Sequence, residues 1–148
     1  MLGQLLITFD DVPNSINAST PIPNGYSGLN WKNALVLNTT AYPQYSQTGF
    51  YSVLKSGKFV ASNSYQKSMS ISTSSFFNLN SLAAAATWLD NSTLTILGER
   101  SSTTVYSITI TLRMQTSSLV SLNWANVDTL VFTTSGSQFA MDNLCMTK

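Results

Sequence analysis

Histidine is absent from the 148-residue chain, and cysteine occurs once, as Cys145. Without histidine the chain cannot form Ser-His-Asp or Cys-His catalytic groups, and most zinc sites are excluded as well. A single cysteine cannot form an internal disulfide. Cys145 has apolar flanks and no basic neighbour in the sequence, so nothing indicates a reactive thiolate. We expect a strand to bury it.

Charged residues are also scarce, at 9% of the chain with a formal net charge of +1. The seven Lys and Arg residues are scattered, whereas phosphate backbones are bound by clustered basic side chains. We therefore expect no nucleic-acid partner. Serine and threonine, with 23 and 18 residues, dominate the polar composition. This composition predicts a polar but uncharged surface.

Long apolar runs are missing too, since none approaches the ~20 residues that span a bilayer. Met1-Leu2-Gly3 leads straight into a strand-like segment, with no signal peptide before it. We expect a mature secreted or extracellular protein whose signal has been removed and which has no membrane span. Three Asn-X-Ser/Thr sequons are candidate glycosylation sites if the source is eukaryotic: Asn17, Asn38 and Asn91.

Alternation of apolar and polar residues, which is typical of strands, recurs along most of the chain. It is clearest over Val105–Leu112 and extends to shorter segments such as Phe50–Leu54, Leu119–Trp124 and Val127–Thr133. Nine or ten short strands with turns every 8–12 residues predict an all-β fold, an antiparallel sandwich of the jelly-roll type. At this length we expect a single domain over residues 1–148.

The segment Phe76–Asp90 requires a choice between helix and strand. Its Ser81–Trp88 portion, with four consecutive alanines, has good helix propensity. It lacks a polar face, however, and strand patterns flank it on both sides. We predict a buried strand.

The two ends of the chain carry matching polar intrusions in apolar strands. Asp10 and Asp11 follow Leu5–Phe9, and Asp142 interrupts the alternating segment Gln138–Met146. A closed sandwich often pairs its first and last strands, which would bring these carboxylates together. Converging oxygens suit Ca²⁺, and the Asn24-Gly25 loop offers further oxygen ligands. The alternative is a solvated turn or carboxylates that cap backbone N–H groups, although Asp142 in either case needs a partner.

Aromatic residues in loops or at strand ends are candidates for stacking on sugars, because their rings are amphipathic and amide and hydroxyl groups lie nearby. The alternative is that these rings cover the ends of the sandwich. For Trp88 and Trp124 we expect core packing. The candidate ligand-binding residues are Tyr26, Trp31, Tyr42, Tyr45 and Tyr51.

Three blocks of sequence, Ile7–Asp11, Ile22–Trp31 and Phe139–Leu144, resemble a family of secreted jelly-roll proteins found in fungi and among bacterial exported proteins. The segments Val105–Ser107 and Leu122–Asp128 are similar to the family pattern as well. The resemblance implies a fold similar to galactose-binding-like domains and carbohydrate-binding modules. It also implies a structural Ca²⁺ near the chain ends, held here by Asp11 and Asp142.

We therefore expect a secreted, non-enzymatic module with a structural calcium site that binds a carbohydrate or cell-wall glycan. The alternative is an extracellular coat or filament subunit, because low charge and Ser/Thr-rich strands permit self-association. An enzyme that pairs Glu99 or Asp128 with Asp90 ranks third, because a glycosidase needs two carboxylates at one cleft.

Overall fold

The structure of the protein is a computed structural model, and it describes residues 3–13, 15 and 19–148. Short helical turns connect the strands in the first half of the chain, at Tyr26–Gly28, Thr39–Ala41, Pro43–Tyr45, α1 (Gly49–Ser52) and Ser64–Gln66. Among the residues that the structure describes, no helix is long and apolar enough to cross a membrane. The strands are β1 (Gln4–Ile7), β2 (Ser19–Pro21), β3 (Asn30–Lys32), β4 (Ala34–Asn38), β5 (Phe59–Asn63), β6 (Met69–Ala86), β7 (Ser92–Arg100), β8 (Thr103–Leu112), β9 (Ser118–Ser135) and β10 (Phe139–Thr147).

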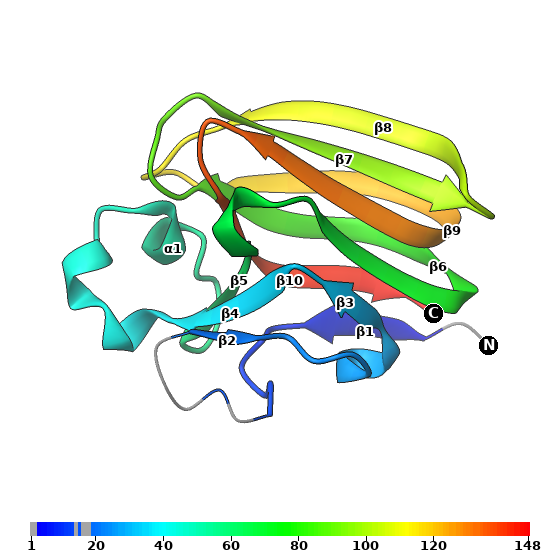
Figure 1. The fold of residues 1–148 in the computed structure, drawn as a ribbon, viewed down its shortest axis with the longest axis horizontal. Helices are drawn as coiled ribbons and strands as arrows, with labels where there is room; N and C mark the ends of the chain where they lie inside the picture. The colour runs from blue at the N-terminus through cyan, green and yellow to red at the C-terminus, as the bar shows by residue number, and fades with distance from the viewer. Residues whose placement is uncertain (1–2, 14, 16–18) are drawn as a thin grey trace.

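All strand pairs are antiparallel, in the order β2-β4-β5-β10-β6-β9-β7-β8, with β1 beside β10 and β3 beside β6 (Figure 1). The two 18-residue strands β6 and β9 pair with each other in two stretches separated by register shifts. The first part of β6 pairs with β3, and its second part pairs with β10. The predicted antiparallel β-sandwich is confirmed. Its first and last strands are neighbours, with Leu6 opposite Cys145.

Strand β9 unites two segments that the sequence pattern separates. We expected strands at Leu119–Trp124 and Val127–Thr133, and the structure has one strand over Ser118–Ser135. Asn123 and Asn126 adopt left-handed backbone conformations, with φ of 52° and 56°. Asparagine tolerates this conformation better than most residues. The break in apolar alternation therefore marks an irregularity within a strand and not its end.

Residues 76–86 of the predicted strand lie in β6, whereas residues 87–90 form the bend and turn before β7. Burial of the alanine run on both faces explains its composition. Successive side chains of a strand point to opposite faces. Ala84 and Ala86 belong to the main core, whereas Ala83 and Ala85 belong to a second apolar cluster that includes Phe50. Because both faces are covered, this part of β6 has no polar face.

The prediction of a strand at Phe50–Leu54 is wrong. Gly49–Ser52 forms the single helical turn α1, and Val53 follows it in a helical conformation. Phe50 and Val53 are 3% and 0% exposed and pack into the same apolar cluster. Residues three apart share one face of a helix but lie on opposite faces of a strand, so this burial favours the helix.

Strand β10 has an irregularity at Asp142–Asn143 that changes which side chains face the core. The register with β6 shifts between Asp142 and Cys145, and Asn143 has a φ of 50°. Such a bulge re-aims the side chains that follow it. Leu144 and Met146 therefore enter the main core. Cys145 points to the outer face and is only half-buried, which corrects the expectation of a buried thiol.

Candidate functional site

The carboxylate of Asp142 is fully buried and holds the loop that follows α1. Its two oxygens accept hydrogen bonds from the backbone N–H groups of Lys55 (2.8 Å), Ser56 (3.1 Å) and Asn143 (2.8 Å). The expectation that this carboxylate needs a partner is confirmed. Burial raises the pKa of Asp142 above its ordinary value of 3.8, although the three backbone donors lower it.

Asp10 holds the same loop from its other side. Its Oδ1 accepts hydrogen bonds from the backbone N–H groups of Lys58 (2.8 Å) and Phe59 (3.0 Å). Gly57 lies against this carboxylate, because a Cβ on Gly57 would meet both Asp10 oxygens at 2.1–2.2 Å. The loop 55–59 is thus clamped between carboxylates from the two ends of the chain. The convergence of the two ends is as predicted.

The other two predicted calcium ligands serve the loop 24–31. Asp11 accepts a hydrogen bond from the Tyr26 hydroxyl (2.6 Å), and Asn24 Oδ1 accepts one from the Trp31 N–H (2.7 Å). Among residues 3–13, 15 and 19–148, no group of three or more His, Cys, Asp or Glu is placed to hold a metal. Every buried side-chain nitrogen and oxygen there already has a hydrogen-bond partner. Calcium at the chain ends stays a prediction, for which Asp10 and Asp142 are the two carboxylates that share a loop.

Tyr26 and Trp31, two of the predicted sugar-binding residues, lie in the core. They are 9% and 6% exposed and pack against each other and against Phe9, with ring centroids 5.9–6.4 Å apart. Burial, together with the hydrogen bond to Asp11 and its charge, raises the pKa of Tyr26 far above its ordinary value. These two rings stabilise the loop 24–31 and have almost no surface on which a sugar could stack.

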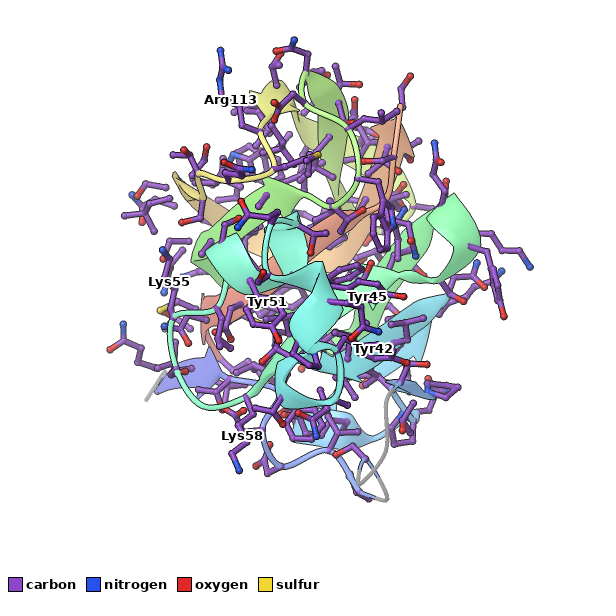
Figure 2. The ribbon with its side chains drawn as sticks, turned by 90° about the vertical axis from the view of Figure 1, so that its left-hand side faces the viewer. Tyr42, Tyr45, Tyr51, Lys55, Lys58 and Arg113 are labelled. Atoms are coloured by element: carbon purple, nitrogen blue, oxygen red, sulfur yellow. The ribbon has the colours of Figure 1, made fainter. Side chains whose placement is uncertain are left out.

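The remaining predicted tyrosines lie together at the end of the sandwich next to α1 (Figure 2). Tyr42 and Tyr45 are half-buried and stack on each other, with centroids 4.8 Å apart and planes 8° apart. The Tyr51 hydroxyl donates to the carbonyls of Thr39 and Tyr42. Tyr51 thereby holds the loop 39–42. The stacked rings of Tyr42 and Tyr45 form one side of an aromatic cluster that also contains Phe50.

Trp88 completes this cluster, which corrects the expectation that it packs in the core. Its side chain is 42% exposed, whereas Trp124 is 8% exposed and is buried as predicted. The rings of Tyr45 and Phe50 are nearly perpendicular to the Trp88 ring, at 85° and 75°, with centroids 5.0 and 5.6 Å from it. The indole N–H points to Gln138 Oε1 at 3.3 Å. The indole is therefore fixed in orientation and open to solvent on part of its surface.

Trp88 and Tyr65 line a shallow hollow of about 290 Å³, together with Gln66, Leu89, Gly136, Ser137 and Gln138. Tyr65 is 86% exposed. Tyr65 and Gln66 both have left-handed backbone conformations, with φ of 51° and 61°. Such conformations are uncommon outside glycine and concentrate at functional sites. The lining is aromatic and amide-rich and contains no charged residue.

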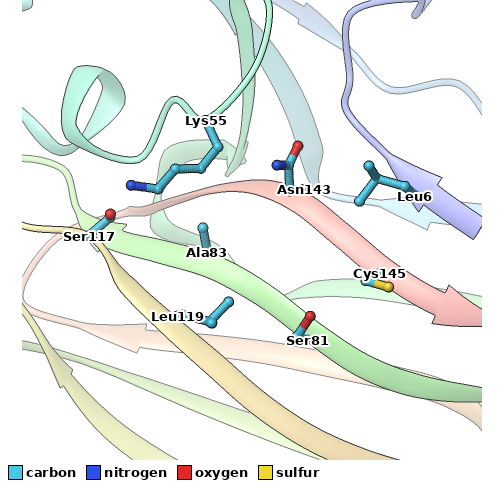
Figure 3. A pocket seen from close by; sticks show the side chains of 8 residues that line it. All are labelled: Leu6, Lys55, Ser81, Ala83, Ser117, Leu119, Asn143 and Cys145. Atoms are coloured by element: carbon cyan, nitrogen blue, oxygen red, sulfur yellow. The ribbon is translucent and has the colours of Figure 1, made fainter.

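A second, larger hollow of about 510 Å³ lies on the outer face of β1, β10, β6 and β9 (Figure 3). It is lined by Leu6, Lys55, Ser81, Ala83, Ser117, Leu119, Asn143 and Cys145. Leu6 and Leu119 are 54% and 75% exposed. The lining contains no aromatic ring, so this hollow offers a sugar no stacking surface.

The carboxylates of the enzyme hypothesis are not brought to one cleft. Asp90 precedes the nine-residue strand β7, and Glu99 lies near its far end, opposite Thr129. At about 3.3 Å per residue, nine residues separate them by roughly 30 Å, whereas glycosidase carboxylates lie about 5–9.5 Å apart. Asp90 accepts a hydrogen bond from the Met114 N–H, and Asp128 accepts one from the Ser101 N–H, both at 2.8 Å.

The sequons differ in their surroundings. Asn91 is exposed in the turn before β7, and Asn38 is half-buried with its Oδ1 bonded to the N–H and hydroxyl of Thr40. Asn17 lies outside the described residues. Glycosylation at these three positions stays a prediction.

The comparisons with known proteins show the fold. No family model matches the chain, and no curated protein does. The adhesin domain K1 of Lys-gingipain from Porphyromonas gingivalis W83 is similar over 99% of this chain and 98% of that domain, with a TM-score of 0.57 and 10% identity. A family 32 carbohydrate-binding module of C. perfringens NanJ in complex with galactose is more distant, with a TM-score of 0.45 and 13% identity over 88% of this chain and 99% of that one. TmCBM61 in complex with β-1,4-galactotriose has a TM-score of 0.44 and 6% identity over 85% of this chain and 94% of that one. The chain thus shares the overall fold of the adhesin domain.

Proposed function

We propose that the chain is a secreted, non-catalytic glycan-binding module whose site is the hollow between Trp88 and Tyr65. The observation that carries the proposal is the exposed indole of Trp88, held at a fixed angle by the rings of Tyr45 and Phe50. A rigid, partly exposed ring binds the apolar face of a sugar without a large loss of conformational freedom.

The polar groups around Trp88 suit sugar hydroxyls. Gln66 is exposed at the rim, and Gln138 is half-buried with its side chain bonded to the Asn63 carbonyl at 2.8 Å. Amides both donate and accept hydrogen bonds, as a hydroxyl does. Because no lining residue is charged, we infer a neutral sugar and not an acidic one.

The fold shared with an adhesin domain is compatible with this role at a cell surface or cell wall, although the site and not the fold supports the proposal. A hollow of this size and shallowness suits one or two sugar rings at the end or edge of a glycan. Tyr42 and Tyr45 extend the aromatic surface beside Trp88 and would contact a longer chain.

A glycan array tests the proposal with five proteins. We expect the wild type to bind neutral glycans, and Trp88→Ala and Tyr65→Ala to lose that binding. Phe76→Ala is the matched control, because Phe76 is an aromatic residue of similar exposure (49%) outside the hollow. Leu119→Ala tests the apolar hollow on the other face. Binding that survives Trp88→Ala, or that Leu119→Ala abolishes, would place the site elsewhere.

A further inference from the structure

Strand β8 is an unprotected sheet edge. It stands at the end of the strand order and pairs only with β7 within the described part of the chain (Figure 1). Its ten residues contain no proline and no charged residue. From Tyr106 to Leu112 its register with β7 is unbroken. A long, regular, uncharged edge presents a row of backbone N–H and C=O groups to another strand.

The other edges of the same sheet are short or irregular. Residues 118–127 of β9 pair only with β6, but the left-handed backbone of Asn123 and Asn126 interrupts that stretch. Strand β2 has three residues and ends at Pro21, β3 has three residues and contains Lys32, and β1 has four residues. Short length, proline and lysine are the usual means of preventing edge pairing. Among the described edges, β8 therefore stands out as open to pairing.

The two faces of β8 match those of a second β8 that runs antiparallel to it. Thr103, Val105, Ser107, Thr109 and Thr111 are all exposed on one face. Tyr106, Ile108 and Ile110 are partly buried against the main core on the other face. The hydroxyls of Thr109 and Thr95 of β7 are hydrogen-bonded at 2.9 Å, so a cross-strand hydroxyl pair already exists on this face.

We propose that β8 is the interface between two copies of this chain, paired antiparallel about a two-fold axis at Ser107. This register gives nearly the full overlap of the strand. It sets Ser107 opposite Ser107, Thr109 opposite Val105 and Tyr106 opposite Ile108. Aromatic and β-branched pairs of this kind stabilise antiparallel sheets. The partly exposed Ile108 and Ile110 would be covered in both copies.

Charge at the ends of the strand favours a second copy as the occupant. The exposed Arg113 follows β8 at one end and projects from the surface (Figure 2). The turn Ser101-Ser102 lies at the other end, where the Asp128 carboxylate accepts a hydrogen bond from the Ser101 N–H. In the antiparallel pair, Arg113 of each copy lies at this turn of the other. There the carboxylates of Glu99 and Asp128 outnumber the single guanidinium of Arg100. That guanidinium is already bonded to the carbonyls of Asn126 and Ala125. The same contact forms twice, as a two-fold interface requires.

Sedimentation velocity over a range of concentrations tests this association. We expect a monomer–dimer equilibrium for the wild type, and Ser107→Lys should weaken it roughly tenfold or more, because two ammonium groups would face each other across the axis. Thr133→Lys is the matched control, since Thr133 is exposed on β9, two strands in from the edge. A strict monomer at the highest soluble concentration would overturn the proposal, and so would equal effects of the two lysines. If β8 instead binds a peptide of another protein, the wild type alone stays monomeric, which would also overturn the proposal.

A disulfide experiment tests the register. Residues directly opposite in an antiparallel pair have Cα atoms about 4.5–5.5 Å apart, within the range that a disulfide spans. In a Cys145→Ser background, Ser107→Cys should give a covalent dimer on mild oxidation, whereas Thr133→Cys should not. A wild-type dimer without preferential cross-linking at position 107 would place the interface elsewhere and contradict the proposal.

Discussion

Gly57 is the position at which a single methyl group should damage the clamp on the loop 55–59 most severely. Its φ is +65°, and a Cβ would lie 2.1–2.2 Å from the Asp10 carboxylate. A left-handed conformation costs a residue with a Cβ about 1–2 kcal/mol. Displacing the Asp10 carboxylate also weakens its hydrogen bonds to Lys58 and Phe59, each worth about 1.5–3 kcal/mol for a charged acceptor.

We therefore expect Gly57→Ala to lower the free energy of unfolding by about 3–5 kcal/mol. Urea unfolding measures this loss. With a slope near 2 kcal/mol per molar, the midpoint should fall by about 2 M. Gly25→Ala is the matched control, because Gly25 also has a positive φ (+95°) but a Cβ there meets nothing within 4 Å. Its cost should be limited to the backbone conformation, about 1–2 kcal/mol.

A double-mutant cycle separates the two parts of the cost. In an Asp10→Ala background the carboxylate is gone, so Gly57→Ala should cost no more than Gly25→Ala does. The difference is the coupling between Gly57 and Asp10, and we expect about 2 kcal/mol. If Gly57→Ala and Gly25→Ala are equally destabilising in the wild-type background, the contact with Asp10 carries no weight and the clamp is refuted.

Two further predictions concern the chain ends. Because the pKa of Asp142 is raised on folding, the folded state binds its proton more tightly, and stability from this group is lost as pH rises from 3.8 through the raised value. In urea titrations, the free energy of unfolding of the wild type minus that of Asp142→Asn should therefore increase as the pH falls through this window. A decrease would mean that the backbone donors affect the pKa of Asp142 more than its burial does. If Ca²⁺ binds at the paired ends, millimolar Ca²⁺ should raise the Tm by several degrees, EDTA should reverse the rise and Asp142→Asn should abolish it. Identical Tm values of Ca²⁺-loaded and metal-stripped protein would show that no such site exists.

Much of the fold follows from local sequence patterns, because burial on one or two faces leaves a direct record in the alternation of residues. The run Leu82–Ala86 has no polar face, and this identifies a strand covered on both sides despite its helix propensity. The pairing of the chain ends could be inferred from Asp10 and Asp142, since a carboxylate in an apolar strand requires a partner from elsewhere.

The errors arise where packing against distant elements decides the outcome. The pattern of Phe50 and Val53 fits a strand or a helix, and the shape of the second apolar cluster selects the helix. The bulge at Asn143 reverses the orientation of Cys145, and nothing in the local pattern fixes its position. Trp31 is buried because Phe9 and Tyr26 pack against it, whereas part of the Trp88 ring is left uncovered. Trp31 lies within β3 and Trp88 just after β6, and neither position fixes the exposure of the ring, so the candidate site could be predicted only in part.

The indole N–H resonances of the three tryptophans test the proposed function most directly. Trp31 and Trp124 are buried, and Trp88 is partly exposed at the hollow. In a nitrogen–proton NMR titration with the neutral glycan that binds best on the array, the Trp88 indole signal, assigned with Trp88→Phe, should shift in a saturable manner while those of Trp31 and Trp124 stay in place. A glycan that binds without moving the Trp88 signal would contradict the account.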